Sequence, residues 1–251
     1  YFRRVVIETS GLADPAPIAY TLLAEPVLQH HFRLGGIITT VDAVNGASQL
    51  QRFPESVKQA AMADRLIVTK TDLATPEERD ALQTSLRGLN KSAPIMEVGE
   101  GQSQPPTLLT DDMYDEGGRQ REIEHWLDAA PGDDALVHDH ADHIHSFALT
   151  YDVPLDWTAF GIWMTMLLHR HGDNVLRIKG LLNVSGVPTP VLINGVQHIV
   201  HPPSHLPAWP NENRQSRIIF IVRDMPQAQI ERSLAAFNKL ANPVAAPGQA
   251  A

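Results

Sequence analysis

Cysteine is absent from the 251-residue chain, and this absence removes a whole class of chemistry. Without thiols the chain forms neither disulfides nor thiolate metal sites, so histidines and carboxylates are the side chains left to hold a metal ion. The sequence also lacks an apolar run of membrane-spanning length and a basic-then-apolar signal peptide at its start. We therefore expect a cytoplasmic protein with no membrane partner.

A second absence is a phosphate-binding loop. No glycine is followed by lysine anywhere in the chain, so the pattern GxxxxGK[ST] does not occur. That loop supplies the backbone N–H groups and the lysine that hold the β and γ phosphates of a nucleotide. The sequence begins with Tyr1 rather than methionine, and an apolar run follows almost at once. We expect that the N-terminal part of a longer protein is missing.

The negative charge lies in one segment. Residues 111–142 contain eleven Asp or Glu against two Arg, which equals the formal net charge of −9 of the whole chain. A charge-dense segment rich in Gly, Gln, Ser and Pro is typical of a solvated connector, here assigned to residues 101–143. The acidity argues against a nucleic-acid partner.

Strands and helices alternate in the first hundred residues. Such alternation predicts a parallel, right-handed α/β sheet. The expected strands are 2–7, 34–42, 65–70 and 94–98, and the expected helices are 15–32 with a break near Pro26, 54–63 and 76–89. Thr75, Pro76 and Glu78 have the spacing of a capping box with proline at the first helical position.

The pattern changes after residue 144 and predicts a two-layer α+β domain with an antiparallel sheet. We expect strands at 144–151, 175–184, 191–201 and 216–223, and helices from Asp156 to Gly172 and at 226–240. The aromatic residues of the first of these helices are assigned to the core. The cations Arg177, Lys179, Arg217 and Arg223 lie on expected strands, where we expect solvated edges or a partner surface.

The stretch that opens the chain ends an apolar run in Glu8, breaks at Ser10-Gly11 and starts a helix at Asp14-Pro15. A carboxylate, a flexible glycine and a helix N-terminus suit a phosphate-and-magnesium site. An ordinary strand–loop–helix connection has the same pattern. Asp42 ends the next strand in the same way and is a weaker candidate with a structural alternative.

A second motif is Thr69-Lys70-Thr71-Asp72, which follows the third expected strand. Guanine presents N1–H and its exocyclic amine as adjacent donors, and a fixed carboxylate such as Asp72 accepts both, whereas adenine cannot satisfy it. Lys70 would lay its stem along the nucleotide. A capped turn with a solvated Lys and Asp is the alternative.

Together, in this order and on these strands, the two motifs resemble the CobW-type proteins of cobalamin synthesis. These are metal-handling GTPases related to the nickel-insertion GTPases of urease and hydrogenase. Glu8-Thr9-Ser10-Gly11 resembles the ExxG element of the family, and Asp14-Pro15 the Asp-Pro that follows it. Residues 69–72 resemble its guanine motif with Thr in place of the commoner Asn. Leu176-Arg177-Ile178-Lys179-Gly180 and residues 216–221 resemble its C-terminal domain.

The resemblance implies a fold and an activity. The fold is a P-loop-type GTPase domain at 1–100 without its first strand and phosphate loop, the connector, a C-terminal domain at 144–241 and a frayed tail at 242–251. The activity, in a full-length parent, is GTP hydrolysis coupled to delivery of zinc or cobalt to a client metalloprotein or cofactor pathway. The family's Cys-x-Cys-Cys metal motif has no counterpart here, as the lack of cysteine requires.

The resemblance also assigns site residues. Glu8 is the catalytic candidate, and Thr69, Lys70 and Asp72 are the nucleotide-binding candidates. Glu8, Gly11 and Asp14 are associated with Mg²⁺, Asp42 is added as the weaker candidate because its strand ends in the same way, and GTP is the expected nucleotide. Self-association stays open. A different class of function is a non-catalytic protein-binding or scaffold module built on the C-terminal domain.

Four histidines, His138, His140, His143 and His145, form an H-x-H-x-x-H-x-H cluster at the end of the connector. Imidazole is a good ligand for zinc, cobalt or nickel, so an auxiliary metal site is one interpretation. A soluble linker whose last histidines enter a strand is the other.

Calorimetry decides between these two interpretations of the cluster. If the histidines bind Zn²⁺ or Co²⁺, the variant with His138→Ala and His140→Ala releases less heat than the unaltered chain in titrations with either ion. Identical heats would remove the metal hypothesis for the connector.

Overall fold

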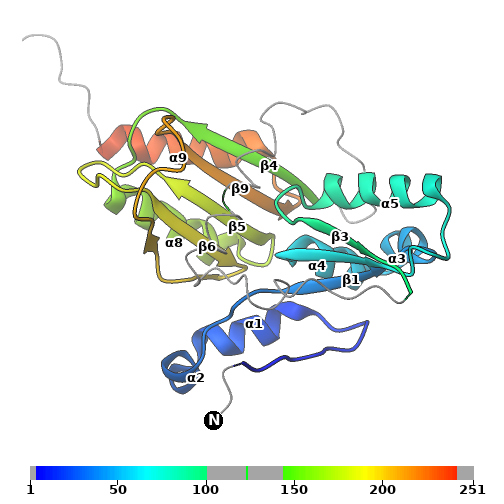
Figure 1. The fold of residues 1–251 in the computed structure, drawn as a ribbon. Coiled ribbons are helices and arrows are strands. Elements are labelled where there is room, and N and C mark those ends of the chain that lie inside the picture. The colour runs from blue at the N-terminus through cyan, green and yellow to red at the C-terminus, as the bar shows by residue number, and fades with distance from the viewer. Residues whose placement is uncertain (1–3, 101–122, 124–143, 242–251) are drawn as a thin grey trace, which may run out of the picture. The chain divides into compact units, whose positions relative to one another are not determined.

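The computed structural model describes residues 4–100, 123 and 144–241, in two compact units, Tyr1–His145 and Ser146–Ala251 (Figure 1). Each unit has its own sheet, as expected from the change in sequence pattern. The boundary falls at the start of strand β4 (Ile144–Tyr151). Among the helices in these described ranges, none has the length and apolar character needed to cross a bilayer.

The first unit contains a parallel sheet in the order β1-β2-β3 within the described residues. The strands are β1 (Ile38–Asp42), β2 (Arg65–Thr69) and β3 (Ile95–Val98), and the helices between them are α3 (Gly46–Arg52), α4 (Pro54–Met62) and α5 (Pro76–Leu89). The register pairs Asp42 with Thr69 and Thr69 with Val98, so the three strands end side by side. This alignment confirms the predicted α/β architecture and brings three loops to one edge.

Local sequence signals set the helix starts of this unit. Asp14 caps α1 (Pro15–Ala24) by accepting a hydrogen bond from the Ala16 N–H at 2.9 Å, and Pro26 starts the separate helix α2 (Pro26–His31). Thr75 and Glu78 form the predicted capping box of α5. Each cap satisfies N–H groups that have no partner inside the helix.

The strand expected at the start of the chain is not formed, and this prediction was wrong. Residues 4–10 carry no regular secondary structure, and Val5, Val6 and Ile7 expose 53%, 68% and 52% of their surface. An apolar run becomes a buried strand only when a neighbouring strand supplies hydrogen bonds and helices cover its faces. Among the described residues, β2 is the sole strand paired with β1, so residues 4–10 have no such support.

The second unit has an antiparallel sheet in the order β4-β9-β5-β6-β7, with β8 also paired to β6, as far as the described residues show. After β4 come α8 (Trp157–His171) and then the strands β5 (Val175–Leu182), β6 (Val191–Val196), β7 (Ile199–Val200), β8 (Ser204–His205) and β9 (Ser216–Arg223), with α9 (Gln227–Ala241) last. The helices pack together through the Trp163 indole N–H, which donates to Ser233 Oγ at 2.9 Å. The predicted α+β order and antiparallel sheet are confirmed.

The core of this unit joins both helices to one sheet face. Phe220 of β9 stacks on Phe147 of β4 at 5.6 Å between ring centroids and meets Trp163 edge-on at 6.3 Å. Gly180 of β5 makes room for Ile193 of β6 in the same core, because a Cβ on residue 180 would lie 2.6 Å from Ile193 Cγ1. The helix residue Trp157, by contrast, is 42% exposed, so its assignment to the core was wrong.

Three cations of the sheet, two on β5 and one on β9, are buried rather than solvated. Arg177 and Lys179 are each 2% exposed and Arg217 of β9 is 8% exposed, so the prediction of solvated edges was wrong for these three. β5 has a hydrogen-bonded neighbour on each side, so its side chains stand on a sheet face and not at an edge. Burial lowers the pKa of the Arg217 guanidinium, because desolvation disfavours the charged form.

Asn90 connects the end of α4 to the chain after α5. Its fully buried amide donates to the carbonyl oxygens of Ala60, Ala61 and Ala63 at 2.9–3.1 Å. Its carbonyl oxygen accepts from the N–H groups of Ser92 and Ala93 and from the Ser92 hydroxyl. One side chain therefore satisfies polar groups from two segments.

Replacing this amide tests its importance. Asn90→Ala leaves those buried backbone groups unsatisfied, and we expect the free energy of unfolding to fall by about 2–3 kcal/mol. Urea denaturation followed by circular dichroism measures the change. The exposed Asn211→Ala serves as the control and stays within about 0.5 kcal/mol of the unaltered chain; equal effects for the two variants would contradict the role of Asn90.

Candidate nucleotide site

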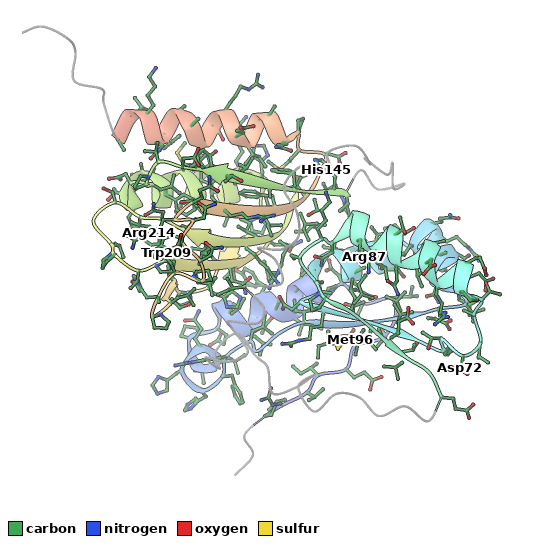
Figure 2. The ribbon with its side chains drawn as sticks, turned by 45° about the horizontal axis from the view of Figure 1, so that its top comes forward. Asp72, Arg87, Met96, His145, Trp209 and Arg214 are labelled. Carbon is green, nitrogen blue, oxygen red and sulfur yellow. The ribbon has the colours of Figure 1, made fainter. Side chains whose placement is uncertain are left out.

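Three loops meet at the carboxyl edge of the parallel sheet. They follow β1 at Asp42, β2 at Thr69 and β3 at Val98, and Figure 2 labels Asp72 in the second of them. In open α/β sheets, ligands bind at this edge because the strand ends deliver loops there together. Thr69, Lys70 and Asp72 of the predicted guanine motif all lie here.

Asp42 is the most fully bonded carboxylate of the edge. Its Oδ1 accepts from the N–H groups of Val44 and Asn45 at 2.8 and 3.1 Å, and its Oδ2 accepts from Asn45 Nδ2 at 3.3 Å. The ammonium of Lys70 lies 2.6 Å from the same Oδ2. Burial raises the pKa of Asp42, but the bonds from Lys70 and the two backbone groups outweigh it and lower that pKa to about 2.

The backbone turns sharply at Lys70. This residue has φ of +57°, the left-handed region that a side chain disfavours, and its carbonyl accepts the Leu73 N–H at 3.0 Å. The Thr69 carbonyl accepts from the Ala43 N–H at 2.9 Å, so the β1 and β2 loops are also joined through the main chain. The motif is therefore a closed turn that presents residues 71 and 72.

Asp72 reaches the third loop. Its Oδ1 accepts the Glu100 N–H at 2.9 Å, and a Cβ on Gly99 would lie 3.3 Å from that oxygen. The side chain is exposed, and its Oδ2 accepts no hydrogen bond from the described residues. One oxygen is thus fixed by the protein and the other is presented to solvent, an arrangement that can receive two adjacent donors of a base.

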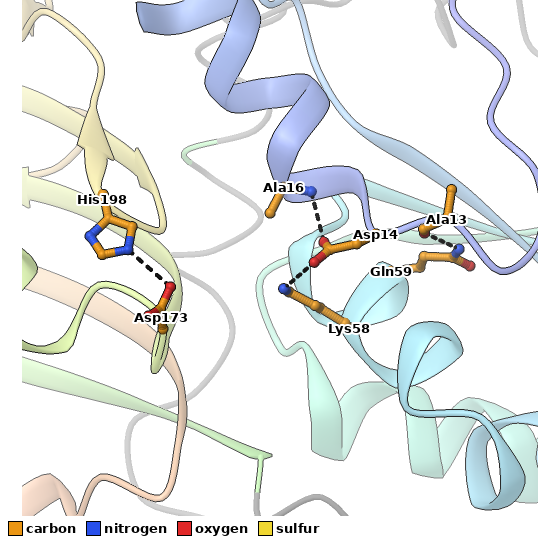
Figure 3. A network of polar contacts seen from close by, with 7 residues as sticks. All are labelled: Ala13, Asp14, Ala16, Lys58, Gln59, Asp173 and His198. Carbon is orange, nitrogen blue, oxygen red and sulfur yellow. Dashed lines mark hydrogen bonds and ion pairs between the residues drawn. The ribbon is translucent and has the colours of Figure 1, made fainter.

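The opening segment is held by α4 instead. Lys58 pairs with Asp14 at 2.5 Å, and Gln59 Nε2 donates to the carbonyl of Ala13 at 2.7 Å (Figure 3). Gln59 Nε2 also donates to the carbonyl of Gly11 at 3.1 Å. Lys58 and Gln59 carry no sequence signal for this role, because a polar pair on an amphipathic helix has no pattern that marks such contacts. Gly11 and Asp14 are thereby fixed, and Glu8 lies exposed in the segment before them.

The residues predicted for magnesium do not form a donor set in this arrangement. Asp14 bonds Ala16 N and Lys58, and Asp42 bonds Lys70 and three N–H groups, so both carboxylates are already engaged. Across residues 4–100 and 144–241 no three His, Asp or Glu side chains are grouped to hold a metal ion.

The structure describes only one histidine of the predicted cluster. His138, His140 and His143 lie outside the described residues, and His145 is half-buried on β4. Elsewhere in the second unit, the His198 ring meets the Leu168 carbonyl at 3.2 Å and Asp173 at 3.0 Å. None of these contacts tests the prediction of an auxiliary metal site.

A groove of about 450 Å³ lies in the second unit between α8 and the β6–β7 edge. None of the predicted site residues lines it. Its walls are mainly apolar with a few polar groups, and the residues are Trp157, Phe160, Gly161, Met164, Thr165, Leu168, His169, Ile193, His198, Val200 and Pro203.

The ionisation of Asp42 is directly measurable. Because its pKa in the folded chain lies below the ordinary 3.8, the ionised form stabilises the fold above about pH 3.8, and this contribution is lost as the pH falls through about 2. Carboxyl ¹³C NMR is expected to show Asp42 still ionised at about pH 3, with a midpoint that rises in Lys70→Ala. A midpoint near the ordinary value in the unaltered chain would contradict this account.

Comparison with known proteins agrees with both units. Residues 1–97 match the family model described as "CobW/HypB/UreG, nucleotide-binding domain", and residues 144–238 match "Cobalamin synthesis protein cobW C-terminal domain". The resemblance noted from the sequence is thus confirmed over both parts of the chain.

Two curated relatives and one crystal structure give the extent of the likeness. Zinc chaperone YjiA of Escherichia coli (strain K12) is 32% identical over 238 residues, which are 95% of this chain and 72% of that protein. Zinc-regulated GTPase metalloprotein activator 1 of Saccharomyces cerevisiae is 27% identical, over 92% of this chain and 61% of its own length. The crystal structure of Zn(II)-bound YjiA GTPase from E. coli superposes with a TM-score of 0.73 and 29% identity, covering 90% of this chain and 68% of that one. Since the two domain models match in order and the sequence and fold agree with the same relative, this chain belongs to the CobW family of metallochaperone GTPases.

Proposed function

We propose that this chain contributes guanine recognition and a C-terminal domain to a GTP-dependent metallochaperone. Binding and slow hydrolysis of GTP in the whole protein would switch it between states that hold and release zinc or cobalt for a client metalloprotein. The observation that carries the proposal is the exposed Asp72 carboxylate, held by Glu100 at the edge where three loops meet. The similarity to a zinc chaperone and to a zinc-regulated activator supports zinc as the cargo.

The proposed roles follow the contacts. Asp72 accepts N1–H and the exocyclic amine of guanine, Lys70 lies along the nucleotide, and Thr69 ends the strand that carries them. Glu8, which is exposed, is proposed beside the reacting phosphates because of its place in the ExxG element. Gly11 and Asp14 shape the loop after it through their contacts with Gln59 and Lys58.

The sequence of these 251 residues contains no phosphate-binding loop, and this bears on affinity. Without N–H groups and a lysine around the β and γ phosphates, most of the binding energy of GTP is missing. We propose that the chain by itself reads the base weakly and neither binds GTP tightly nor hydrolyses it.

Base selectivity tests the proposal. In NMR titrations, GMP is expected to bind at millimolar concentration about tenfold more tightly than AMP, because adenine leaves the Asp72 carboxylate without donors. GTP is expected to bind within about tenfold of GMP. In Asp72→Asn the preference moves to XMP, whose C2 carbonyl accepts from the new amide.

A matched control is Asp80→Asn, the same change on the exposed face of α5. It is expected to keep the GMP preference. Equal binding of GMP and AMP by the unaltered chain would reject base recognition, and micromolar affinity for GTP would reject the claim of missing phosphate contacts.

A non-catalytic protein-binding module is the second candidate. One observation favours it: Trp157, Ile162 and Met166 of α8 are 42%, 52% and 56% exposed, and Trp157 lines the apolar groove of the second unit. Exposed apolar surface beside a groove is a common feature of protein interfaces. Failure of the base-selectivity experiment would favour this candidate over the first.

A further inference from the structure

The turn of the guanine motif has three ties to its neighbours. The main chain bonds Thr69 to Ala43, the Asp72 carboxylate bonds Glu100, and the Lys70 ammonium pairs with Asp42. A fourth contact, from the Thr69 hydroxyl to the Val41 carbonyl, is long at 3.4 Å and contributes little. Asp42 therefore supplies the main side-chain tie at the start of the turn.

We propose that Asp42 is a positioning residue for base recognition, which holds Lys70 so that the turn presents Asp72 to guanine. The inference rests on the proposed function. It replaces the magnesium role suggested for Asp42 by the sequence, because the Lys70 ammonium and three N–H groups of its own turn already occupy this carboxylate.

The geometry favours positioning over simple stabilisation. Lys70 exposes 57% of its side chain, and ion pairs of such exposure add little to the stability of a fold. Asp42 is only 16% exposed, and its other hydrogen bonds come from Val44 and Asn45 of its own turn. A rigid carboxylate thus fixes a cation that is otherwise free to move in solvent.

The fixed cation lies at the one residue of the turn whose backbone is strained. Lys70 is left-handed, and its carbonyl closes the turn by accepting the Leu73 N–H, so its placement determines the direction of residues 71 and 72. When the pair is lost, the turn samples more conformations and Asp72 is presented correctly for less of the time. The apparent affinity for guanine then falls in proportion to the fraction of time for which the turn presents Asp72 correctly.

The test uses Asp42→Asn, Lys70→Met and the double variant. The asparagine side chain keeps an oxygen for the Val44 and Asn45 N–H groups but offers Lys70 no charge, and methionine keeps most of the length of the lysine. We expect Asp42→Asn to weaken GMP about threefold, the effect of an exposed ion pair, and to leave AMP unchanged. In the Lys70→Met background the same change is expected to have no further effect on GMP.

Glu97→Gln is the matched control, because it breaks the exposed Arg79–Glu97 pair of the same unit at 3.0 Å without touching the motif. It is expected to leave GMP binding unchanged. The proposal is overturned if Asp42→Asn weakens the binding of GMP and AMP equally or does not weaken GMP binding at all. It is also overturned if Asp42→Asn weakens GMP binding a full threefold in the Lys70→Met background. If the unaltered chain itself shows no preference for GMP, the proposed function fails and this inference falls with it.

Discussion

Parallel pairing of β1, β2 and β3 is the constraint from which the candidate site follows. With Asp42 opposite Thr69 and Thr69 opposite Val98, the next residue of each strand enters a loop at the same edge. Residues that lie far apart in the chain then meet without any local signal. Hydrogen bonds between these loops, together with the bond that closes the turn from Leu73 N–H to the Lys70 carbonyl, hold Asp72 at an exposed position.

At the same edge, the weak ion pair between Asp42 and Lys70 restricts the conformation of a loop. An exposed ion pair contributes about 0.2–1 kcal/mol to stability, yet it restricts a left-handed turn whose direction decides where a carboxylate lies. The opening segment is restrained in a comparable way, by Lys58 and Gln59 from α4. In each case a residue on one element sets the position of a loop that belongs to another.

Patterns that depend on neighbouring residues were predictable. The Asp14 cap, the capping box at Thr75 and the break at Pro26 depend on a few adjacent groups, and all three are found. The short helix α3 was missed because only Gly46 and Leu50 of it are buried, which leaves no apolar period to detect. The run 5–7 was assigned to a strand because composition does not report whether a pairing partner exists.

The sequence by itself determined most of the order of strands and helices and the change from a parallel to an antiparallel sheet, because periodicity and capping are properties of nearby residues. Only the tertiary structure decided that Arg177 and Lys179 are buried, that Val5 to Ile7 are exposed and that Asp42 pairs with Lys70. Burial and pairing depend on which distant segments come together. In each unit, the strand register and the order of strands in the sheet determine which segments do so.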